Sequence, residues 1–314
     1  MAPSLLRIRA LEKGDLADVT AWARAEHFAP GQGDVAIYRH TDRQGLWVGC
    51  LNGRPIGCIA GVRYNAEYGF IGMFLVQPEH RGQGFGRELW QRALQHLEGL
   101  TCIGIEAAPD RIGDFASWGF APASPTQRWQ RISDGNLPPA ATPEGLSLLE
   151  GSAIPDRAVQ AYDAQRELSP RPDFLADWLH HPAGTVLALI GPDGSCHGFG
   201  RIRPCLLHRG EGWRIGPLLA DTPALAAQLL NALMARHAGV VLIDAPAANP
   251  EAGPPAAAVG FCGGRRDAED VSGQPAAGSP WRCLRVGLPG AGLSAAGGEA
   301  SLRCSNDSQQ QQAA

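Results

Sequence analysis

The hydrophobic pattern between residues 70 and 97 predicts a buried strand followed by an amphipathic helix. Residues 70–76 are apolar or glycine, which is typical of a strand covered on both faces. One helix face is then marked by apolar residues at Leu89, Ala93, Leu94 and Leu97. The strand and the helix are joined by a segment with three glycines, residues 81–86.

Similar patterns surround this unit. Asn52-Gly53 between two apolar runs is a strong signal for a two-residue hairpin turn. The hairpin strands are expected at 46–50 and 56–63. After the helix, the pattern predicts a strand at 101–106, a short helix at 110–118 and then Gly119-Phe120. Residues 5–132 are thereby accounted for as one α/β domain, so the first domain is predicted at 1–132.

The order of elements recurs in weaker form in the second half of the chain, predicted as a domain at 146–262. Ile215-Gly216 and Gly260-Phe261 parallel Ile71-Gly72 and Gly119-Phe120, which indicates an internal repeat of about 140 residues. Chance similarity of short α/β units is the alternative. Prolines, glycines and small polar residues at 133–145 favour a linker. The predicted strands are 185–190, 198–203, 213–219 and 240–244, with a helix at 223–237.

The glycine-rich segment suits a phosphorylated ligand. Gly82, Gly84 and Gly86 lack a Cβ atom, so a ligand can approach the main chain. The N–H groups of the first helical turn have no intrahelical partners, and the helix dipole is positive there. No Gly-Lys-Ser/Thr follows, which excludes a P-loop, and a hairpin before strand 70–76 is unlike an N-terminal dinucleotide fold. A packing turn is the alternative.

The segment matches the R/Q-x-x-G-x-G/A signature of the GNAT superfamily of N-acetyltransferases, and the chain also resembles this superfamily in its order of elements. The resemblance implies an α/β fold with a mixed sheet (α+β), and acetyl-CoA as co-substrate. It also implies that pantetheine pairs with the end of strand 70–76. The implied cofactor-binding residues are Phe74, Leu75, Val76, Arg81, Gly82, Gln83, Gly84, Phe85, Gly86 and Phe115.

The second half lacks this loop. Its equivalent residues, 225–230, form an apolar helix turn with neither glycine nor a basic residue. The chain resembles a bacterial tandem group with a degenerate GNAT-like C-terminal domain, whose pattern is similar to GWRIGPLLAD at 212–221. This resemblance covers about residues 5–262. We expect the second domain to cover the substrate side of the first, or to stabilise the chain, and not to bind the coenzyme.

Acetyl transfer to an amine needs a base, because an alkyl amine with a pKa of about 10 is almost fully protonated at pH 7. Glu106, at the end of the strand beside the cofactor strand, is the first candidate, since burial can raise a carboxylate pKa. A surface carboxylate is the alternative. Glu26 and His27 come next, because the resemblance implies that the loop after the first helix lines the acceptor pocket. A main-chain N–H of residues 74–76 would stabilise the oxyanion.

An acid is missing at the expected place. Many GNAT proteins have a tyrosine four residues before the glycine of the Gly-Phe pair, and its hydroxyl reaches the coenzyme sulfur. This chain has Phe115 there, which cannot donate a proton. The thiolate must be protonated by water or another group, or leave unaided. Unaided departure is possible because the pKa of the coenzyme thiol is not far above that of cysteine, which is about 8.5.

Composition and charge narrow the function classes. The net charge of −4 is mild, and no basic run with interleaved aromatics indicates a nucleic acid partner. No stretch suits a signal peptide or a bilayer span, so we expect a cytoplasmic protein without a membrane partner. The eight cysteines form no C-x-x-C pair, and Cys50 and Cys58 do not face each other in the hairpin register. His180-His181 before a proline indicates a helix end, so no metal is assigned.

We therefore predict an N-acetyltransferase that moves an acetyl group from acetyl-CoA to a primary amine of a small molecule or a protein. An acyl-CoA-binding regulatory module without transfer, and an acyltransferase using a longer acyl-CoA, are the alternatives. Assembly as a homodimer is left open. The tail 263–314 is rich in Gly, Ala and Ser, and we expect it to be disordered or to result from a frameshift near residue 262.

Overall fold

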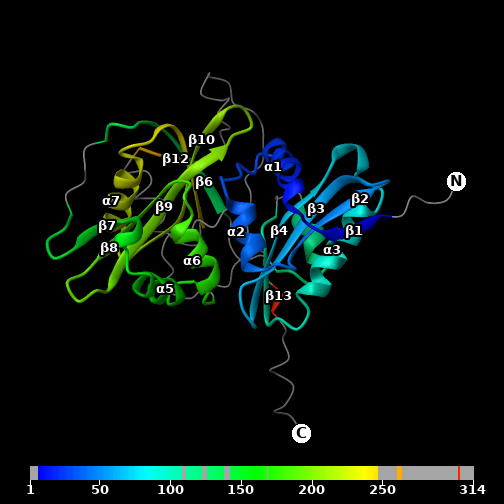
Figure 1. The fold of residues 1–314 in the computed structure, drawn as a ribbon, viewed down its shortest axis with the longest axis horizontal. Coiled ribbons are helices and arrows are strands. Elements are labelled where there is room, and N and C mark those ends of the chain that lie inside the picture. Colours follow the sequence, from blue (N-terminus) through cyan, green and yellow to red (C-terminus); the bar gives the residue numbers. More distant parts are fainter. Residues whose placement is uncertain are drawn as a thin grey trace, which may run out of the picture.

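The chain folds into two mixed α/β domains, each with its own sheet (Figure 1). A computed structural model describes residues 6–107, 111–121, 126–137, 142–167, 169–246, 260–263 and 303–304. The fold class predicted from the sequence is confirmed. In these residues, no helix has both the length and the apolar character needed to cross a membrane.

The first sheet has the strand order β1-β2-β3-β4-β5-β13. Strands β1 to β4 pair antiparallel, whereas β4 and β5 are parallel. Separate apolar clusters join the sheet to helices α1 and α2 on one face and to α3 and α4 on the other. The bounds are β1 Arg7–Ala10, α1 Leu16–Ala25, α2 Asp34–Thr41, β2 Leu46–Leu51, β3 Arg54–Arg63, β4 Tyr68–Val76, α3 Phe85–His96, β5 Cys102–Ile105, α4 Ile112–Ala116 and β13 Arg303–Cys304.

The second sheet has the strand order β12-β6-β11-β10-β9-β8-β7. Helices α5 and α6 pack on one face, and α7 packs on the other. The neighbouring strands β10 and β11 are parallel, as β4 and β5 are in the first sheet. The bounds are β6 Thr126–Asp134, β7 Ser147–Glu150, α5 Asp156–Ala164, α6 Pro172–His180, β8 Thr185–Ile190, β9 Cys196–Leu206, β10 Glu211–Ala220, α7 Pro223–Met234, β11 Ala238–Pro246 and β12 Cys262–Gly263.

Each sheet takes a strand from the other half of the chain. Strand β6 pairs antiparallel with β11 along its whole length, from Thr126 opposite Pro246 to Asp134 opposite Ala238. In the first sheet, β13 pairs with β5. The predicted division between residues 132 and 133 follows the sequence repeat and falls inside β6. The two halves are therefore joined by main-chain pairing as well as by the linker.

Most of the predicted elements are confirmed, with ends that differ by a few residues. Strand β8 has the predicted bounds, and α6 ends at His180 as the pattern indicates. Helix α7 ends at Met234, three residues before the predicted end, because β11 already begins at Ala238. Cys58 lies opposite Val48, and not opposite Cys50. The start of the predicted helix 110–118 and most of the tail 263–314, with the proposed frameshift, lie outside the described residues.

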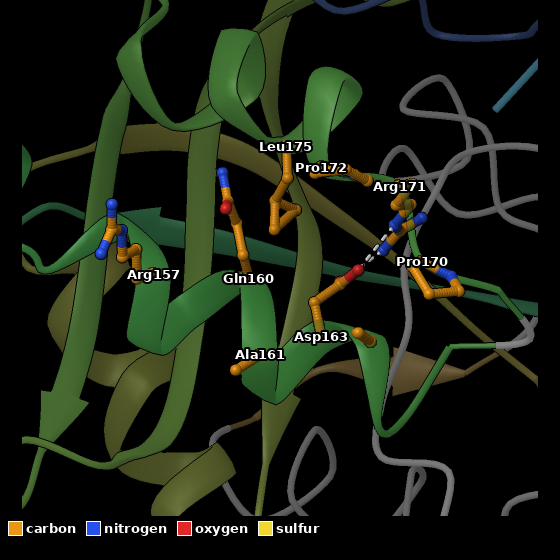
Figure 2. Close-up of a pocket in the computed structure, with 9 residues that line it drawn as sticks. Arg157, Gln160, Ala161, Asp163, Pro170, Arg171, Pro172 and Leu175 are labelled. Carbon is orange, nitrogen blue, oxygen red and sulfur yellow. Dashed lines mark hydrogen bonds and ion pairs between the residues drawn. The ribbon is translucent and has the colours of Figure 1, made fainter. Parts of the chain in front are cut away.

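Helices α5 and α6 enclose a cavity of about 270 Å³ on the second domain (Figure 2). Its lining residues all lie between positions 157 and 175. A buried ion pair bounds one side, with Arg171 Nη2 donating to Asp163 Oδ1 at 2.8 Å and Nε donating to Oδ2 at 3.0 Å. This cavity is separate from the glycine-rich segment, because no residue of the first domain lines it.

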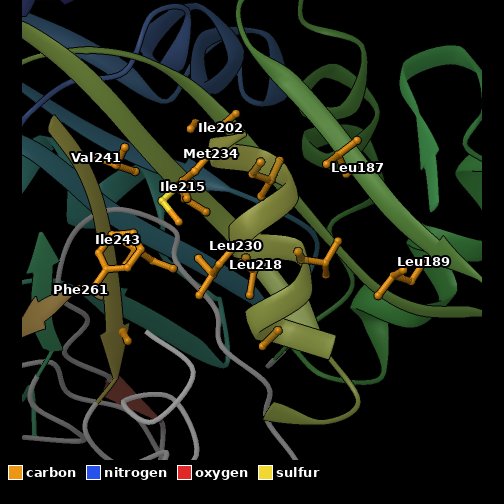
Figure 3. Packing of buried hydrophobic residues seen from close by; sticks show 14 residues of the cluster. Leu187, Leu189, Ile202, Ile215, Leu218, Leu230, Met234, Val241, Ile243 and Phe261 are labelled. Carbon is orange, nitrogen blue, oxygen red and sulfur yellow. The ribbon is translucent and has the colours of Figure 1, made fainter. Parts of the chain in front are cut away.

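The core of the second domain lies between α7 and the sheet (Figure 3). Leu229, Leu230 and Met234 of α7 are completely buried. They belong to one apolar cluster with Ile215 of β10 and Val241 of β11, the two parallel strands. Residues 225–230, which the sequence offset places opposite the glycine-rich segment, therefore lie inside α7 and contribute to packing. That correspondence is wrong, because α7 begins at Pro223 after Thr222 just as α3 begins at Phe85 after Gly84.

Leu229→Arg should destabilise the protein by more than about 4 kcal/mol, because it removes a fully buried apolar side chain and puts an unpaired charge in its place. Thermal unfolding measures the loss. Ala224→Arg, at an exposed position of the same helix, is the matched control and should change the free energy of unfolding by less than about 0.5 kcal/mol. An equal effect of the two variants would contradict the packing of α7 described above.

Candidate functional site

The C-terminal half of β4 has no neighbouring strand on the side of β5. The parallel pairing stops at Ile71 opposite Ile105, and β4 continues to Val76. On its other side, β4 stays paired with β3 as far as Val76 opposite Gly57. Within the described residues, no strand covers positions 72–76 on the β5 side. This edge therefore has main-chain donors and acceptors that an extended ligand can pair with.

A β-bulge interrupts β4 at this edge. Cys58 lies opposite Leu75, but Ala60 lies opposite Gly72, so two residues of β4 face one residue of β3. Met73, in the bulge, has a φ of 48°, which is in the left-handed region that non-glycine residues rarely adopt. Such a bulge takes main-chain groups out of the regular ladder and turns them elsewhere. Strained backbone of this kind is concentrated at functional sites.

The glycine-rich segment lies between β4 and α3 and begins the helix without a side-chain cap. Gly82 has a φ of 73° and Gly84 a φ of 90°, so both positions need glycine. A Cβ atom added at either position would meet no other atom within 4 Å. The open space lies next to the uncapped N–H groups of α3, where a helix of this length attracts an anion.

The side chains at the end of β4 alternate between the two faces of the sheet. Leu75 is buried in the cluster under α1 and α2, whereas Phe74 and Val76 belong to the cluster under α3. A Cβ atom added at Gly86 would lie 3.4 Å from Phe74 Cζ and 3.6 Å from Val76 Cγ2. The first turn of α3 therefore packs on the end of β4, and a Cβ atom at Gly86 would be in ordinary van der Waals contact with both side chains. Phe85 packs against the same cluster.

Arg81 joins the glycine-rich segment to the loop after α1. Its Nε atom donates to the Val76 carbonyl at 2.8 Å, and its Nη2 atom forms an ion pair with Glu26. Both partners are more than one third exposed, so the pair contributes no more than about 1 kcal/mol. Gln83 donates to the Glu79 carbonyl at 3.0 Å, in the turn just before the segment. Two predicted site residues that lie far apart in the sequence, Glu26 and Arg81, are thereby brought together.

Glu106 and His27 both lie close to Arg128 of β6. Burial lowers the pKa of Arg128, but the charge of Asp244 and, more weakly, that of Glu106 raise it above the ordinary value. Arg128 Nη1 donates to the His27 carbonyl at 3.1 Å. Glu106 is half-buried directly after β5, and the His27 ring stacks on His208 of the second domain at 4.2 Å between ring centres. The three predicted catalytic residues thus lie in one region, at the ends of β4 and β5 and in the loop after α1.

Phe115 of α4 packs in the apolar cluster under α3. Its ring centre lies 5.1 Å from that of Trp90, and Phe74 lies on Trp90 at 5.7 Å. Phe115 is half-buried and belongs to the same apolar cluster as Phe74 of β4. The side chain adds an apolar surface beside the predicted pantetheine strand and has no proton to donate.

The start of α7 in the second domain is unlike the start of α3. Thr222 caps it, with its hydroxyl oxygen accepting from Leu225 N at 3.3 Å, and Pro223 has no N–H group. The strand β10 has a register shift between Ile215 and Leu218 that corresponds to the bulge in β4. The order of strand and helix is the same in both domains, but at the start of α7 one first-turn donor is used by the Thr222 cap and another is absent at Pro223.

Comparison with known proteins finds one family match in each half of the chain. The model of the acetyltransferase (GNAT) family matches residues 16–121, and that of an acetyltransferase (GNAT) domain matches residues 159–272. A holothin acyltransferase from a Pseudoalteromonas species is 27% identical over 230 residues, which cover 73% of this chain and 74% of that protein.

Solved structures also resemble the whole chain. A Pyrococcus horikoshii protein proposed to be an acetyltransferase has a TM-score of 0.68 at 20% identity and covers 93% of this chain and 95% of its own. A tandem GNAT protein from the clavulanic acid biosynthesis pathway has a TM-score of 0.56 at 18% identity and covers 82% of this chain and 95% of its own. At these identities the likeness concerns the fold.

Proposed function

The chain belongs to the GNAT acetyltransferase family and has two GNAT domains in tandem, and on this premise we propose that its first domain transfers an acetyl group from acetyl-CoA to a primary amine. GNAT proteins use acyl-CoA donors. We propose two further points: the group transferred is acetyl, and the acceptor is an amine of a small molecule or a protein. We propose neither nucleic acid nor a membrane as a partner.

One observation carries the proposal: the uncapped start of α3 lies beside an edge of β4 that has no strand partner. The space at Gly82 and Gly84 suits a pyrophosphate, which would accept from the first-turn N–H groups. The edge at residues 72–76 suits the amides of pantetheine, which would extend the sheet as a short strand does. The donor would then run from the helix to the bulge at Met73.

The chain's own groups would meet two needs of acyl transfer, and water would meet a third. An N–H group at the bulge would donate to the thioester oxygen as negative charge develops there, a donor that contributes about 2.7–4 kcal/mol in another enzyme. Glu106 would take a proton from the ammonium group of the acceptor, directly or through water. The free amine then attacks the carbonyl carbon, and its nitrogen gives a second proton to water. The C–S bond breaks, and the thiolate leaves and is protonated from water, because Phe115 has no donor.

Two observations favour alternatives. Phe115 in place of a proton donor favours an acyl-CoA-binding regulatory module that does not catalyse transfer. The similarity to a protein named as an acyltransferase, without a specified acyl group, is equally compatible with a donor that has a longer chain.

Incubation with acetyl-CoA and a panel of primary amines, holothin among the acceptors tried, tests the proposal through the release of free thiol. We expect thiol release that depends on the amine. Binding of acetyl-CoA without release by any amine would support the regulatory module. Competition among acyl-CoAs of increasing chain length, with the best amine fixed, separates acetyl transfer from transfer of a longer group.

Phe115→Tyr should raise kcat if departure of the thiolate limits the rate, because the hydroxyl supplies the missing proton donor. The increase in kcat should be greatest at about pH 7, which lies below the pKa of the thiol, because protonation of the departing sulfur is favoured there. Steady-state rates between pH 6 and 9 measure it. Phe120→Tyr, in the same cluster but fully buried, is the control. If the kcat of Phe115→Tyr equals that of the parent protein at every pH, thiolate departure is not rate-limiting.

A further inference from the structure

The loop between α1 and α2, residues 26–33, is held in an unusual conformation. His27 has a φ of 61° and Ala29 a φ of 48°, and neither residue is glycine. Left-handed backbone at such residues is unfavourable and persists only where the surroundings fix it. The loop contains the candidate residues Glu26 and His27. What fixes it therefore also positions these two side chains.

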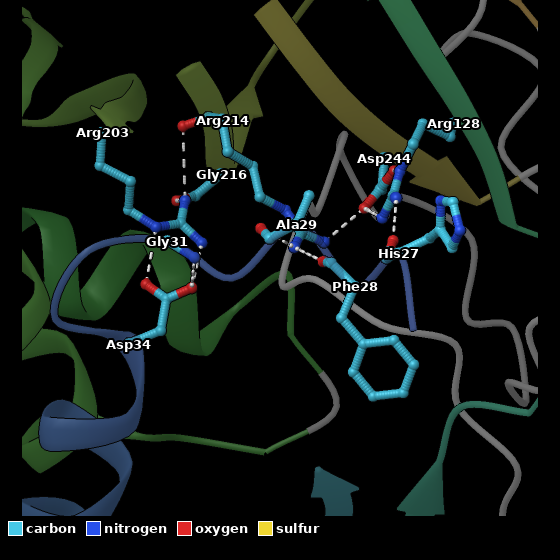
Figure 4. A network of polar contacts seen from close by, with 10 residues as sticks. All are labelled: His27, Phe28, Ala29, Gly31, Asp34, Arg128, Arg203, Arg214, Gly216 and Asp244. Atoms are coloured by element: carbon cyan, nitrogen blue, oxygen red, sulfur yellow. Dashed lines mark hydrogen bonds and ion pairs between the residues drawn. The ribbon is translucent and has the colours of Figure 1, made fainter. Parts of the chain in front are cut away.

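Two arginines hold the strained part of the loop through its carbonyl groups (Figure 4). Arg128 Nη1 donates to the His27 carbonyl at 3.1 Å. Arg214 Nη1 donates to the Phe28 carbonyl at 2.8 Å and to the Ala29 carbonyl at 3.1 Å. Three consecutive carbonyls are thus bound by side chains of the second sheet, since Arg128 lies on β6 and Arg214 on β10.

Asp244 of β11 fixes both arginines. Arg128 Nε donates to Oδ1 at 2.7 Å and Nη2 to Oδ2 at 2.9 Å, while Arg214 Nη2 donates to Oδ2 at 2.5 Å. Asp244 is 4% exposed and Arg214 5%, so these charges are removed from water. Burial would raise the pKa of Asp244, but the charges of the two arginines hold it well below the ordinary value. The carboxylate is therefore ionised when it binds them. We refer to Arg128, Arg214 and Asp244 as the clamp.

The main chain continues the attachment after the clamp. Leu206 N donates to the Pro30 carbonyl at 3.1 Å, and Gln32 N donates to the Pro204 carbonyl at 2.8 Å. Gly31 and Cys205 form a β-bridge, so the loop runs beside β9 for a short distance. Beyond it, Arg203 binds both carboxylate oxygens of Asp34 at 2.7 and 2.8 Å at the start of α2.

We propose that the second domain, which lacks the loop for the coenzyme, forms one wall of the acceptor site by holding residues 26–33 through the clamp. The clamp residues are positioning residues, and His208 contacts His27 from the same side. The proposal rests on the proposed function in so far as the loop borders the acceptor. It makes the degenerate domain necessary for acceptor recognition and unnecessary for coenzyme binding.

Asp244→Asn tests the clamp, because the amide keeps the size of the carboxylate but removes the charge that fixes both arginines. Asp163→Asn is the matched control: Asp163 is equally buried, binds Arg171 with both oxygens, and makes no contact with the loop. Hydrogen exchange of the peptide covering 26–33 should be at least about tenfold faster in Asp244→Asn than in Asp163→Asn, since the loop amides of Phe28 and Gln32 are hydrogen-bonded.

Kinetics give the second measurement. In Asp244→Asn, kcat/KM for the amine should fall by about 10- to 100-fold, as expected when a site is displaced by about 1 Å. The Kd of acetyl-CoA should change by no more than about fivefold, because the clamp does not touch the segment 81–86 and the exposed Arg81–Glu26 pair that joins this segment to the loop contributes at most about 1 kcal/mol. Asp163→Asn should keep both values at those of the parent protein.

Equal exchange of the loop in the two variants would overturn the proposal whatever the activity. If no amine is acetylated, the proposed function fails, and the exchange measurement still decides whether the clamp holds the loop. Should Asp244→Asn not fold, Arg214→Lys replaces it, since lysine keeps the charge but has one nitrogen where Arg214 uses two, Nη1 for the carbonyls and Nη2 for Asp244. Loop exchange as slow in that variant as in the parent protein would equally overturn the proposal.

Discussion

Gly84→Val should weaken the binding of acetyl-CoA by about 100-fold or more, because loss of two charge-assisted hydrogen bonds at about 1.5–3 kcal/mol each has at least that effect. The Cβ position at Gly84 meets no atom of the protein within 4 Å, so the added side chain enters the space proposed for the pyrophosphate. It would separate the phosphate oxygens from the first-turn N–H groups of α3. Titration calorimetry with acetyl-CoA measures the change.

A glycine just after the other end of α3 is the control that separates the loss of acetyl-CoA affinity from a loss of stability. Gly99 follows the other end of α3, has a φ of 83°, and also has open space at its Cβ position. Gly99→Val and Gly84→Val should both destabilise the protein by about 1–2 kcal/mol, the energy of a left-handed non-glycine residue. The affinity for acetyl-CoA should fall in Gly84→Val alone. Unchanged affinity in a folded Gly84→Val protein would make the segment a packing turn.

The elements predicted from the sequence are those whose surroundings are uniform. Strands β4 and β8 are covered on both faces, so they read as apolar runs, and α3 is half-buried, so it has a regular apolar face. Strand β6 has neither pattern: its residues are mostly half-exposed or exposed, and Ile132 is 57% exposed. The sequence of β6 also does not indicate which of the two sheets the strand joins, because this choice depends on the packing of the whole chain.

The candidate site divides in the same way. The segment 81–86 is visible in the sequence because the left-handed backbone at Gly82 and Gly84 requires glycine. The bulge at Met73 leaves no such sign, since methionine is an ordinary strand residue. The clamp leaves a partial one: Arg214 and Asp244 are charges inside apolar strands, and buried charges need partners. Which charges pair can be decided only when the order of the strands is known.

Glu106→Gln should lower kcat/KM for the amine by about 10²- to 10⁴-fold, the range for loss of a general base. The amide keeps the size of the side chain but cannot take a proton. The acidic limb of the pH profile should flatten, because the base that titrates there is gone. Raising the pH toward the amine pKa of about 10 should bring the variant closer to the parent protein, because solvent then supplies the free amine.

A change at Glu106 also alters the charge near Arg128, and through it the loop 26–33. Two measurements distinguish this indirect effect from loss of a base. In Glu106→Gln, loop exchange and acetyl-CoA affinity should match the parent protein, whereas displacement of the loop would change the exchange. Glu67→Gln, exposed just before β4, is the control for the loss of a carboxylate. A decrease in kcat/KM of less than about threefold would be far smaller than the loss expected for a general base. It would exclude Glu106 from that role and leave Glu26, His27 or solvent to accept the proton.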